Sequence, residues 1–130
     1  MTWEGKDAAG LLAAGMKPST LTHLLSLLPD YGNYERLSAG KLDELKIPRV
    51  KPVEVDIKGL TTVLFGSERY PKRLATISAP PPVLFVKGTI PAATGVALIG
   101  TRQMTRIGSA VATIGAQAAA ELGVPVVSGL

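Results

Sequence analysis

Hydrophobic residues in the first part of the chain recur at the spacing of a helix. In the clearest row, four leucines stand at positions i, i+3, i+4 and i+7: Leu21, Leu24, Leu25 and Leu28. This row predicts a helix over residues 18–29, and shorter apolar rows predict two more, over residues 8–15 and 38–47. Gly15 stands where it would end the first of them. Residues 1–47 are therefore expected to form a small helical module.

A stretch of prolines and alternating charges follows this module. Residues 48–60 read "PRVKPVEVDIKGL" and contain two prolines. Prolines disfavour a helix, and this pattern is typical of an extended connector. We therefore interpret residues 48–60 as a linker and as the candidate domain boundary.

From residue 61 the pattern changes to short apolar runs that are typical of strands. Four such runs cover residues 61–66, 83–88, 95–100 and 124–130. The longest helix is predicted over residues 106–122. Its apolar residues trace one face at helical spacing, and they are Ile107, Val111, Ile114, Ala118 and Leu122. Strand, helix and strand with a short return loop predict a βαβ unit with parallel, right-handed pairing.

The last residues, Ser128-Gly129-Leu130, stand at the tip of the last predicted strand. In α/β folds the next functional loop usually begins at such a tip. A sheet that stopped there would have an open edge and an uncovered apolar face. We therefore expect the chain to be a fragment, a truncated gene product or one part of a split protein.

Composition narrows the possible chemistry. The 130 residues contain no cysteine and one histidine, which excludes a disulfide framework, a thiolate metal site and a His-rich metal cluster. No apolar run approaches the ~20 residues of a membrane span, and the N-terminus lacks the usual form of a signal peptide. This composition fits the cytoplasm.

The positive charge is unevenly distributed. Residues 1–68 hold eight Lys and Arg against nine Asp and Glu, whereas residues 69–130 hold six against one. The second half therefore carries a net charge of +5, which suggests an anionic partner for that half. The alternative is a basic surface without a partner.

The stretch "VALIGTRQMTRIG", residues 96–108, joins an apolar strand to the long helix. It fits neither the dinucleotide fingerprint G-x-G-x-x-G nor the P-loop pattern. A glycine at a strand end, a hydroxyl, arginines and a helix N-terminus nevertheless suit an anion. The candidate anion-binding residues are Gly100, Thr101, Arg102, Arg106, Ser128 and Gly129. The alternative is an arginine that caps a surface loop of an ordinary βαβ unit.

Two segments of this half resemble the DNA-processing protein A family (DprA, also called Smf). The first segment carries Tyr70-Pro71, Leu74, Ile77, Pro81, Leu84-Phe85 and Gly88. The second carries Gly100-Thr101-Arg102, Gly108 and Ser128-Gly129. The resemblance covers about residues 60–130.

The resemblance implies an incomplete Rossmann-like domain over residues 61–130, with a parallel βαβ sheet, after the helical N-terminal module. The expected fold class is thus α/β. It also implies binding of single-stranded DNA and loading of the RecA recombinase, in DNA uptake and natural transformation. By motif position Gly100, Thr101 and Arg102 hold a DNA phosphate, with Ser128 and Gly129 nearby, and Arg106 is added on charge and geometry. Dimerisation in the family depends on a later part, so a homodimer is expected where that part is supplied.

Catalysis has almost no support in the sequence. The carboxylates form no paired acid–base arrangement, no serine has a plausible histidine partner, and no cofactor or metal is implied. Two other functions stay open: a Rossmann-like nucleotide hydrolase or sensor, and a truncated remnant without a ligand. Among the other residues, Lys72 and Arg73 either extend a basic groove or lie on a solvated helix face, and Trp3 is read as a packing anchor rather than a base-stacking residue.

Overall fold

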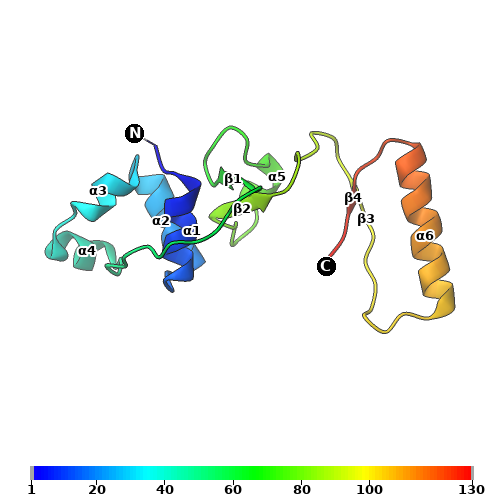
Figure 1. Ribbon diagram of the computed structural model, residues 1–130, viewed down its shortest axis with the longest axis horizontal. Helices are drawn as coiled ribbons and strands as arrows, with labels where there is room; N and C mark the ends of the chain where they lie inside the picture. The colour runs from blue at the N-terminus through cyan, green and yellow to red at the C-terminus, as the bar shows by residue number, and fades with distance from the viewer. Residues whose placement is uncertain (1, 130) are drawn as a thin grey trace. The chain divides into compact units, whose positions relative to one another are not determined.

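The computed structural model describes residues 2–129, which form two compact units (Figure 1). Unit 1 is Met1–Gly88 and unit 2 is Thr89–Leu130. Unit 1 begins with four helices and continues with two strands that flank a short helix, and unit 2 is a strand, a long helix and a strand. The mixed α/β class predicted from the sequence is confirmed. The predicted partition into residues 1–47, 48–60 and 61–130 stays a prediction.

Helices α1 (Gly5–Ala13) and α2 (Pro18–Leu27) confirm the first two predicted helices. The chain leaves α1 through Gly15, whose φ of +94° lies in the left-handed region that favours glycine. The Gly15 N–H donates to the carbonyl of Leu12 at 3.0 Å, which closes the last turn. Helix α2 begins at Pro18. Proline suits this first position because it has no N–H, and an N–H there would have no partner within the helix. Local chemistry therefore accounts for this hairpin of helices.

Two shorter helices complete the helical part of unit 1. Helix α4 (Ala39–Leu45) confirms the third predicted helix, and the Ser38 hydroxyl caps its N-terminus. Helix α3 (Tyr31–Glu35) was not predicted, because five residues are too few to show a helical period. Its sequence signal was Asp30, which accepts a hydrogen bond from a backbone N–H three residues later at 2.8 Å.

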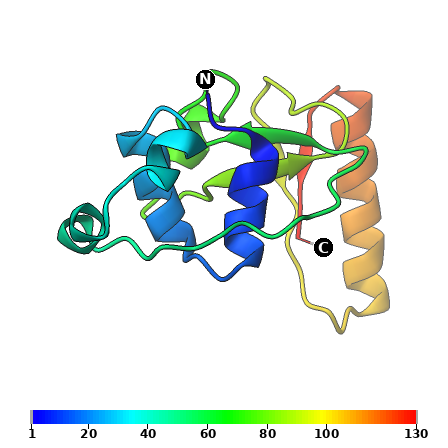
Figure 2. The same ribbon diagram turned by 60° about the vertical axis from the view of Figure 1, so that its left-hand side comes forward.

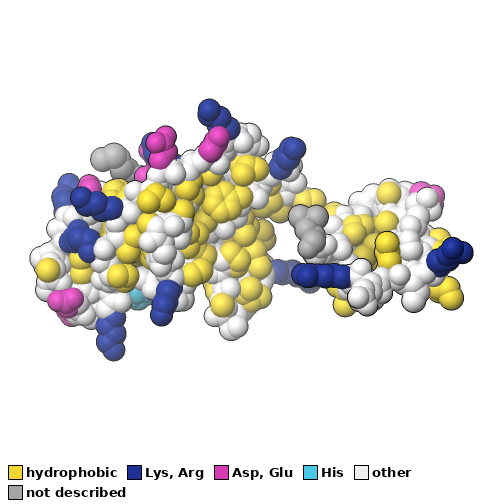
Figure 3. Space-filling view, turned by 60° about the horizontal axis from the view of Figure 1, so that its bottom comes forward, with side chains coloured by type: hydrophobic (Ala, Val, Ile, Leu, Met, Phe, Trp, Pro, Cys, Tyr) yellow, Lys and Arg dark blue, Asp and Glu magenta, His cyan; other side chains and the backbone are white. Residues whose placement is uncertain are grey.

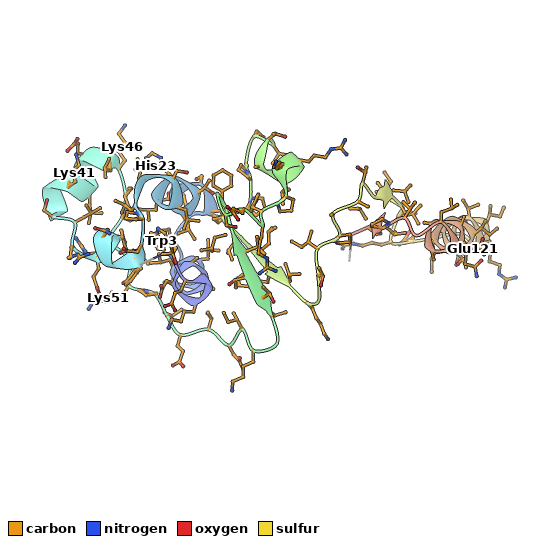
Figure 4. All side chains as sticks on the ribbon, turned by 90° about the horizontal axis from the view of Figure 1, so that it is seen from above. Trp3, His23, Lys41, Lys46, Lys51 and Glu121 are labelled. Atoms are coloured by element: carbon orange, nitrogen blue, oxygen red, sulfur yellow. The ribbon has the colours of Figure 1, made fainter. Side chains whose placement is uncertain are left out.

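The core of unit 1 draws side chains from all four helices and from both strands. Its buried members are Trp3, Ala8, Leu11, Met16, Leu21, Leu24, Tyr34, Leu42, Ile47 and Val83, with Leu64 packed against them. Trp3 is 9% exposed, and its indole N–H donates to the carbonyl of Leu28 at 2.8 Å (Figure 4). This tryptophan is therefore a packing anchor.

The connector after α4 has no regular structure from Pro48 to Ile57, as its prolines predicted. It is nevertheless fastened to the helices. The Tyr34 hydroxyl donates to the carbonyl of Pro48 at 2.8 Å and accepts from the N–H of Val50 at 2.7 Å. One buried side chain thus bonds both the carbonyl of Pro48 and the N–H of Val50, and Tyr34 thereby fixes the path of the connector.

Strand β1 (Thr61–Leu64) pairs antiparallel with β2 (Val83–Val86), and helix α5 (Lys72–Ala75) lies in the connection between them. The pair lies beside α1 (Figure 2). A side chain at Gly5, the first residue of α1, would overlap the side chain of Thr62 in β1. The absence of a Cβ at Gly5 therefore lets helix and sheet approach this closely.

In unit 2, strand β3 (Val96–Ala97) pairs in parallel with β4 (Val126–Val127), and helix α6 (Arg106–Glu121) connects them. The predicted order of strand, helix and parallel strand is confirmed. Both strands are much shorter than predicted, because only two residues of each form the ladder, and each strand has one neighbour.

Helix α6 packs on its strands through small residues rather than through its large apolar ones. Ala119 is 5% exposed, and Gly115 faces the side chain of Leu98 after β3. The apolar row that the sequence showed on this helix lies on the exposed side. Its large members are 64–78% exposed: Ile107, Val111, Ile114 and Leu122. Small residues face the strands because they allow the closest approach of helix and strand. Within residues 2–129 no helix is long and apolar enough to cross a membrane.

Replacement of Gly5 by alanine tests the close packing of α1 on β1. Gly5→Ala should destabilise unit 1 by about 1–3 kcal/mol, because the new methyl group overlaps Thr62 and the backbones must separate. Urea unfolding followed by the fluorescence of Trp3, the one tryptophan, measures this change. Gly40→Ala is the matched control, because an added Cβ at Gly40 meets no atom within 4 Å. Equal stability of the two variants would contradict the packing.

Candidate functional site

The parallel pairing of β3 with β4 brings the turn that begins after β3 close to Ser128, which follows β4. The N–H of Leu98, directly after β3, donates to the carbonyl of Val127 at 3.0 Å. The Ser128 hydroxyl, directly after β4, donates to the carbonyl of Leu98 at 2.9 Å. One side-chain bond thus adds to the backbone ladder, and it holds the first residues of the turn beside Ser128.

The turn between β3 and α6 is open around its glycine. An added Cβ at Gly100 would meet no atom within 4 Å, and its φ lies outside the left-handed region. Packing and backbone conformation therefore do not require glycine here, and its absent side chain leaves room for a ligand to approach the backbone. The Thr101 hydroxyl oxygen accepts from the N–H of Gln103 at 3.2 Å, so its hydrogen is left to donate to another group.

Thr105 sets the start of α6, and sequence reasoning missed it. Its hydroxyl oxygen accepts from the N–H of Gly108 at 3.0 Å, as an N-cap does. Arg106 is the first residue of the helix. The signal was the threonine directly before the predicted helix, a residue type that N-caps prefer.

Arg102 and Arg106 are exposed on this turn. In the described part of the chain the two salt bridges join Lys6 with Glu4 and Lys41 with Glu44. Neither arginine has a carboxylate partner there, so both guanidinium groups keep their donors for an external anion.

Gly100, Thr101 and Ser128 line one cavity of about 870 Å³ within unit 2. Thr105, Gly108 and Thr113 line it as well, and apolar residues of β3, β4, α6 and the turn form the rest of its wall. The structure thus brings three of the six predicted site residues to one cavity. Arg102, Arg106 and Gly129 do not line it, and the phosphate contacts of all six residues stay a prediction.

The first motif segment, in unit 1, contributes to the scaffold. Tyr70 is 5% exposed, its hydroxyl donates to the carbonyl of Pro81 at 2.7 Å, and its ring meets the edge of Phe65. Burial raises the pKa of the Tyr70 hydroxyl above its ordinary value, which keeps it a proton donor at neutral pH. Two motif positions thus join the two ends of the connection between β1 and β2.

Residues 2–129 contain no cluster of metal ligands, at this turn or elsewhere. No group of three His, Cys, Asp or Glu side chains lies close enough there to hold a metal ion. The polar groups at the turn include hydroxyls, backbone N–H groups and guanidinium groups, which are donors suited to an anion.

Removal of the Thr105 cap tests how α6 is held at the turn. Thr105→Ala should cost unit 2 about 1 kcal/mol, because the Gly108 N–H loses its acceptor. Thr113→Ala is the control, since the Thr113 hydroxyl bonds only within the helix and alanine is the better helix former. Hydrogen exchange of the α6 amides measures both. Faster exchange in the Thr113 variant than in the Thr105 variant would contradict the assigned cap.

Comparison with known proteins gives one match. The model of a family described as DNA recombination-mediator protein A matches residues 61–130, just over half of the chain. No curated protein and no solved structure matches the chain. The matched region runs from β1 through β4, so it includes both the Tyr70 scaffold and the turn at Gly100. The chain therefore belongs to the DNA recombination-mediator protein A family.

Proposed function

We propose that this protein binds single-stranded DNA without catalysis and holds one of its phosphates at the turn after β3. The family supports a role in DNA processing during recombination. The observation that carries the proposal is the hydrogen bond from the Ser128 hydroxyl to the carbonyl of Leu98. Together with the parallel pairing of β3 and β4, this bond holds the turn beside Ser128, and Gly100, Thr101 and Ser128 line one cavity.

The available donors suit a phosphate. The Thr101 hydroxyl has a hydrogen free to donate, and the backbone at Gly100 is open to approach. Arg102 and Arg106 supply guanidinium groups without carboxylate partners among the described residues, and guanidinium groups match phosphate oxygens in pairs. A contact of this kind reads charge and not base sequence, as expected for a protein that handles any single strand.

The finer parts of the role rest on the family. We assign to this chain the loading of the RecA recombinase, in DNA uptake and natural transformation in the cytoplasm. We assign pairing into a homodimer to the chain only where the later part of the family is supplied. We also infer a Rossmann-like fold for residues 61–130, which the parallel β3–α6–β4 unit supports. The exposed row of Ile107, Val111, Ile114 and Leu122 on α6 is an apolar surface in unit 2 that such protein contacts would bury.

The proposal predicts that Arg102→Ala weakens binding to a thymidine oligomer. For the parent protein the logarithm of the binding constant should fall linearly with the logarithm of the salt concentration. Loss of one phosphate contact should make this slope shallower by about 0.7. Fluorescence anisotropy over a salt series measures both affinity and slope.

Lys51→Ala is the control for this variant, because it removes one exposed cation from unit 1 and leaves the turn unchanged. Calorimetry with AMP separates the alternative function. AMP binding without oligomer binding would assign the site to a small nucleotide. An Arg102→Ala protein that folds and binds like the parent would remove Arg102 from the site.

A further inference from the structure

The basic charge of the chain is concentrated away from the turn at Gly100. Residues 1–60 hold eight cationic and eight acidic side chains, and residues 89–130 hold two arginines and one glutamate. Residues 61–88 carry a net charge of +3, from Arg69, Lys72, Arg73 and Lys87 against Glu68. The segment around α5 in unit 1 is therefore the most basic part of the molecule.

Three of these cations lie within five residues, and all three are exposed: Arg69, Lys72 and Arg73. We call these residues the α5 basic surface. None of them has a salt-bridge partner in the described part of the chain, where the salt bridges involve Lys6 and Lys41. Figure 3 shows Lys and Arg side chains that stand out from the surface of both units. The α5 cations are thus free to meet an external anion.

The backbone under the α5 basic surface is held in place. Tyr70, between two of its members, is buried and hydrogen-bonded to the carbonyl of Pro81. The Thr76 hydroxyl donates to the carbonyl of Arg73 at 2.9 Å, and the N–H of Leu74 donates to the carbonyl of Pro71 at 2.9 Å. A partner therefore meets cations on an ordered backbone, which lowers the entropy cost of binding.

A cleft of about 450 Å³ adjoins this surface within unit 1. Arg69 lines it, together with the aromatic residues Trp3 and Phe65, the apolar residues Leu25 and Pro29, and the hydroxyl residues Thr2, Thr62 and Ser67. A guanidinium group beside a cleft with aromatic and hydroxyl side chains fits a nucleotide whose base is not paired, since the phosphate and the base then find different partners.

We propose that the α5 basic surface binds the phosphate backbone of a DNA single strand, and that an unpaired base of that strand enters the cleft beside Arg69. This inference rests on the proposed binding of single-stranded DNA, and it adds a contact on unit 1 to the one proposed for unit 2. Three cations that contact three phosphates displace three sets of counterions, so the contact has a measurable salt signature.

The test compares three full-length proteins over a salt series with a thymidine oligomer. They are the parent, Arg69→Gln/Lys72→Gln/Arg73→Gln, and a control with the same charge loss, Lys41→Gln/Lys51→Gln/Lys58→Gln. The control lysines are exposed in unit 1 and lie outside residues 61–88 (two of them are labelled in Figure 4). Circular dichroism checks that each variant folds, and Lys72→Gln/Arg73→Gln replaces the triple variant where it does not.

The measured quantity is the slope of the logarithm of the binding constant against the logarithm of the salt concentration. The α5 variant should have a slope shallower by about 2, or by about 1.4 for the double variant, whereas the control should keep the parent slope. A folded α5 variant with the parent slope would overturn the inference. In that case the proposed function would still stand if the parent binds the oligomer and Arg102→Ala binds it more weakly. A parent protein that binds no oligomer would overturn both.

The placement of the base has its own readout. Trp3 is the one tryptophan of the chain and lines the cleft, so its fluorescence should change when the thymidine oligomer binds. An abasic oligomer of the same length carries the same phosphates, and its binding should leave the emission unchanged. Emission that the thymidine oligomer does not change, or that both oligomers change equally, would overturn the entry of a base into the cleft.

Discussion

The parallel pairing of β3 with β4 is the constraint on which the candidate site depends. Parallel strands put their carboxyl ends at the same edge, so the pairing places the turn after β3 beside Ser128. Helix α6 supplies the crossover that such a pair needs, and Gly123, with a φ of +63°, turns the chain back toward β4. The ladder itself is two residues long, which makes the additional bond from Ser128 to Leu98 a substantial part of what holds the edge together.

Much of unit 1 was predictable because its signals are local. Gly15, Pro18 and Ser38 act within one or two residues of a helix end, so the sequence shows them directly. Helix α3 escaped prediction because one turn has no period to recognise. The fastening of the connector by Tyr34 was equally hidden, since a hydroxyl that bonds residues 14 and 16 positions away leaves no pattern in the sequence.

In unit 2 the order of elements was predictable, and their packing was not. The apolar row of α6 is plain in the sequence, but small residues such as Gly115 and Ala119 make the contact with the strands. An apolar pattern indicates which faces avoid water, and a helix that is apolar on two sides does not reveal which side meets the sheet. The candidate site was easier to predict, because a parallel βαβ unit puts the ends of its two strands at the same sheet edge. Gly100 and Ser128 accordingly line one cavity.

The two motif segments of the family have different physical roles in this chain. Tyr70 and Pro81 join two parts of a connection in unit 1, and Gly100 and Ser128 line an open cavity in unit 2. The most basic segment and the turn at Gly100 therefore lie on separate units. A polyanion has enough repeated phosphates to meet both, whereas a single nucleotide has not.

The central claim is that the two paired strand ends in unit 2 form one phosphate site. Nuclear magnetic resonance of the ¹⁵N-labelled chain, titrated with a thymidine oligomer, tests it most directly because each backbone amide reports separately. The amides of Gly100, Thr101, Ser128 and Gly129 should shift together along one binding curve. Shifts at only one of the two strand ends, or at neither while other residues respond, would contradict the claim.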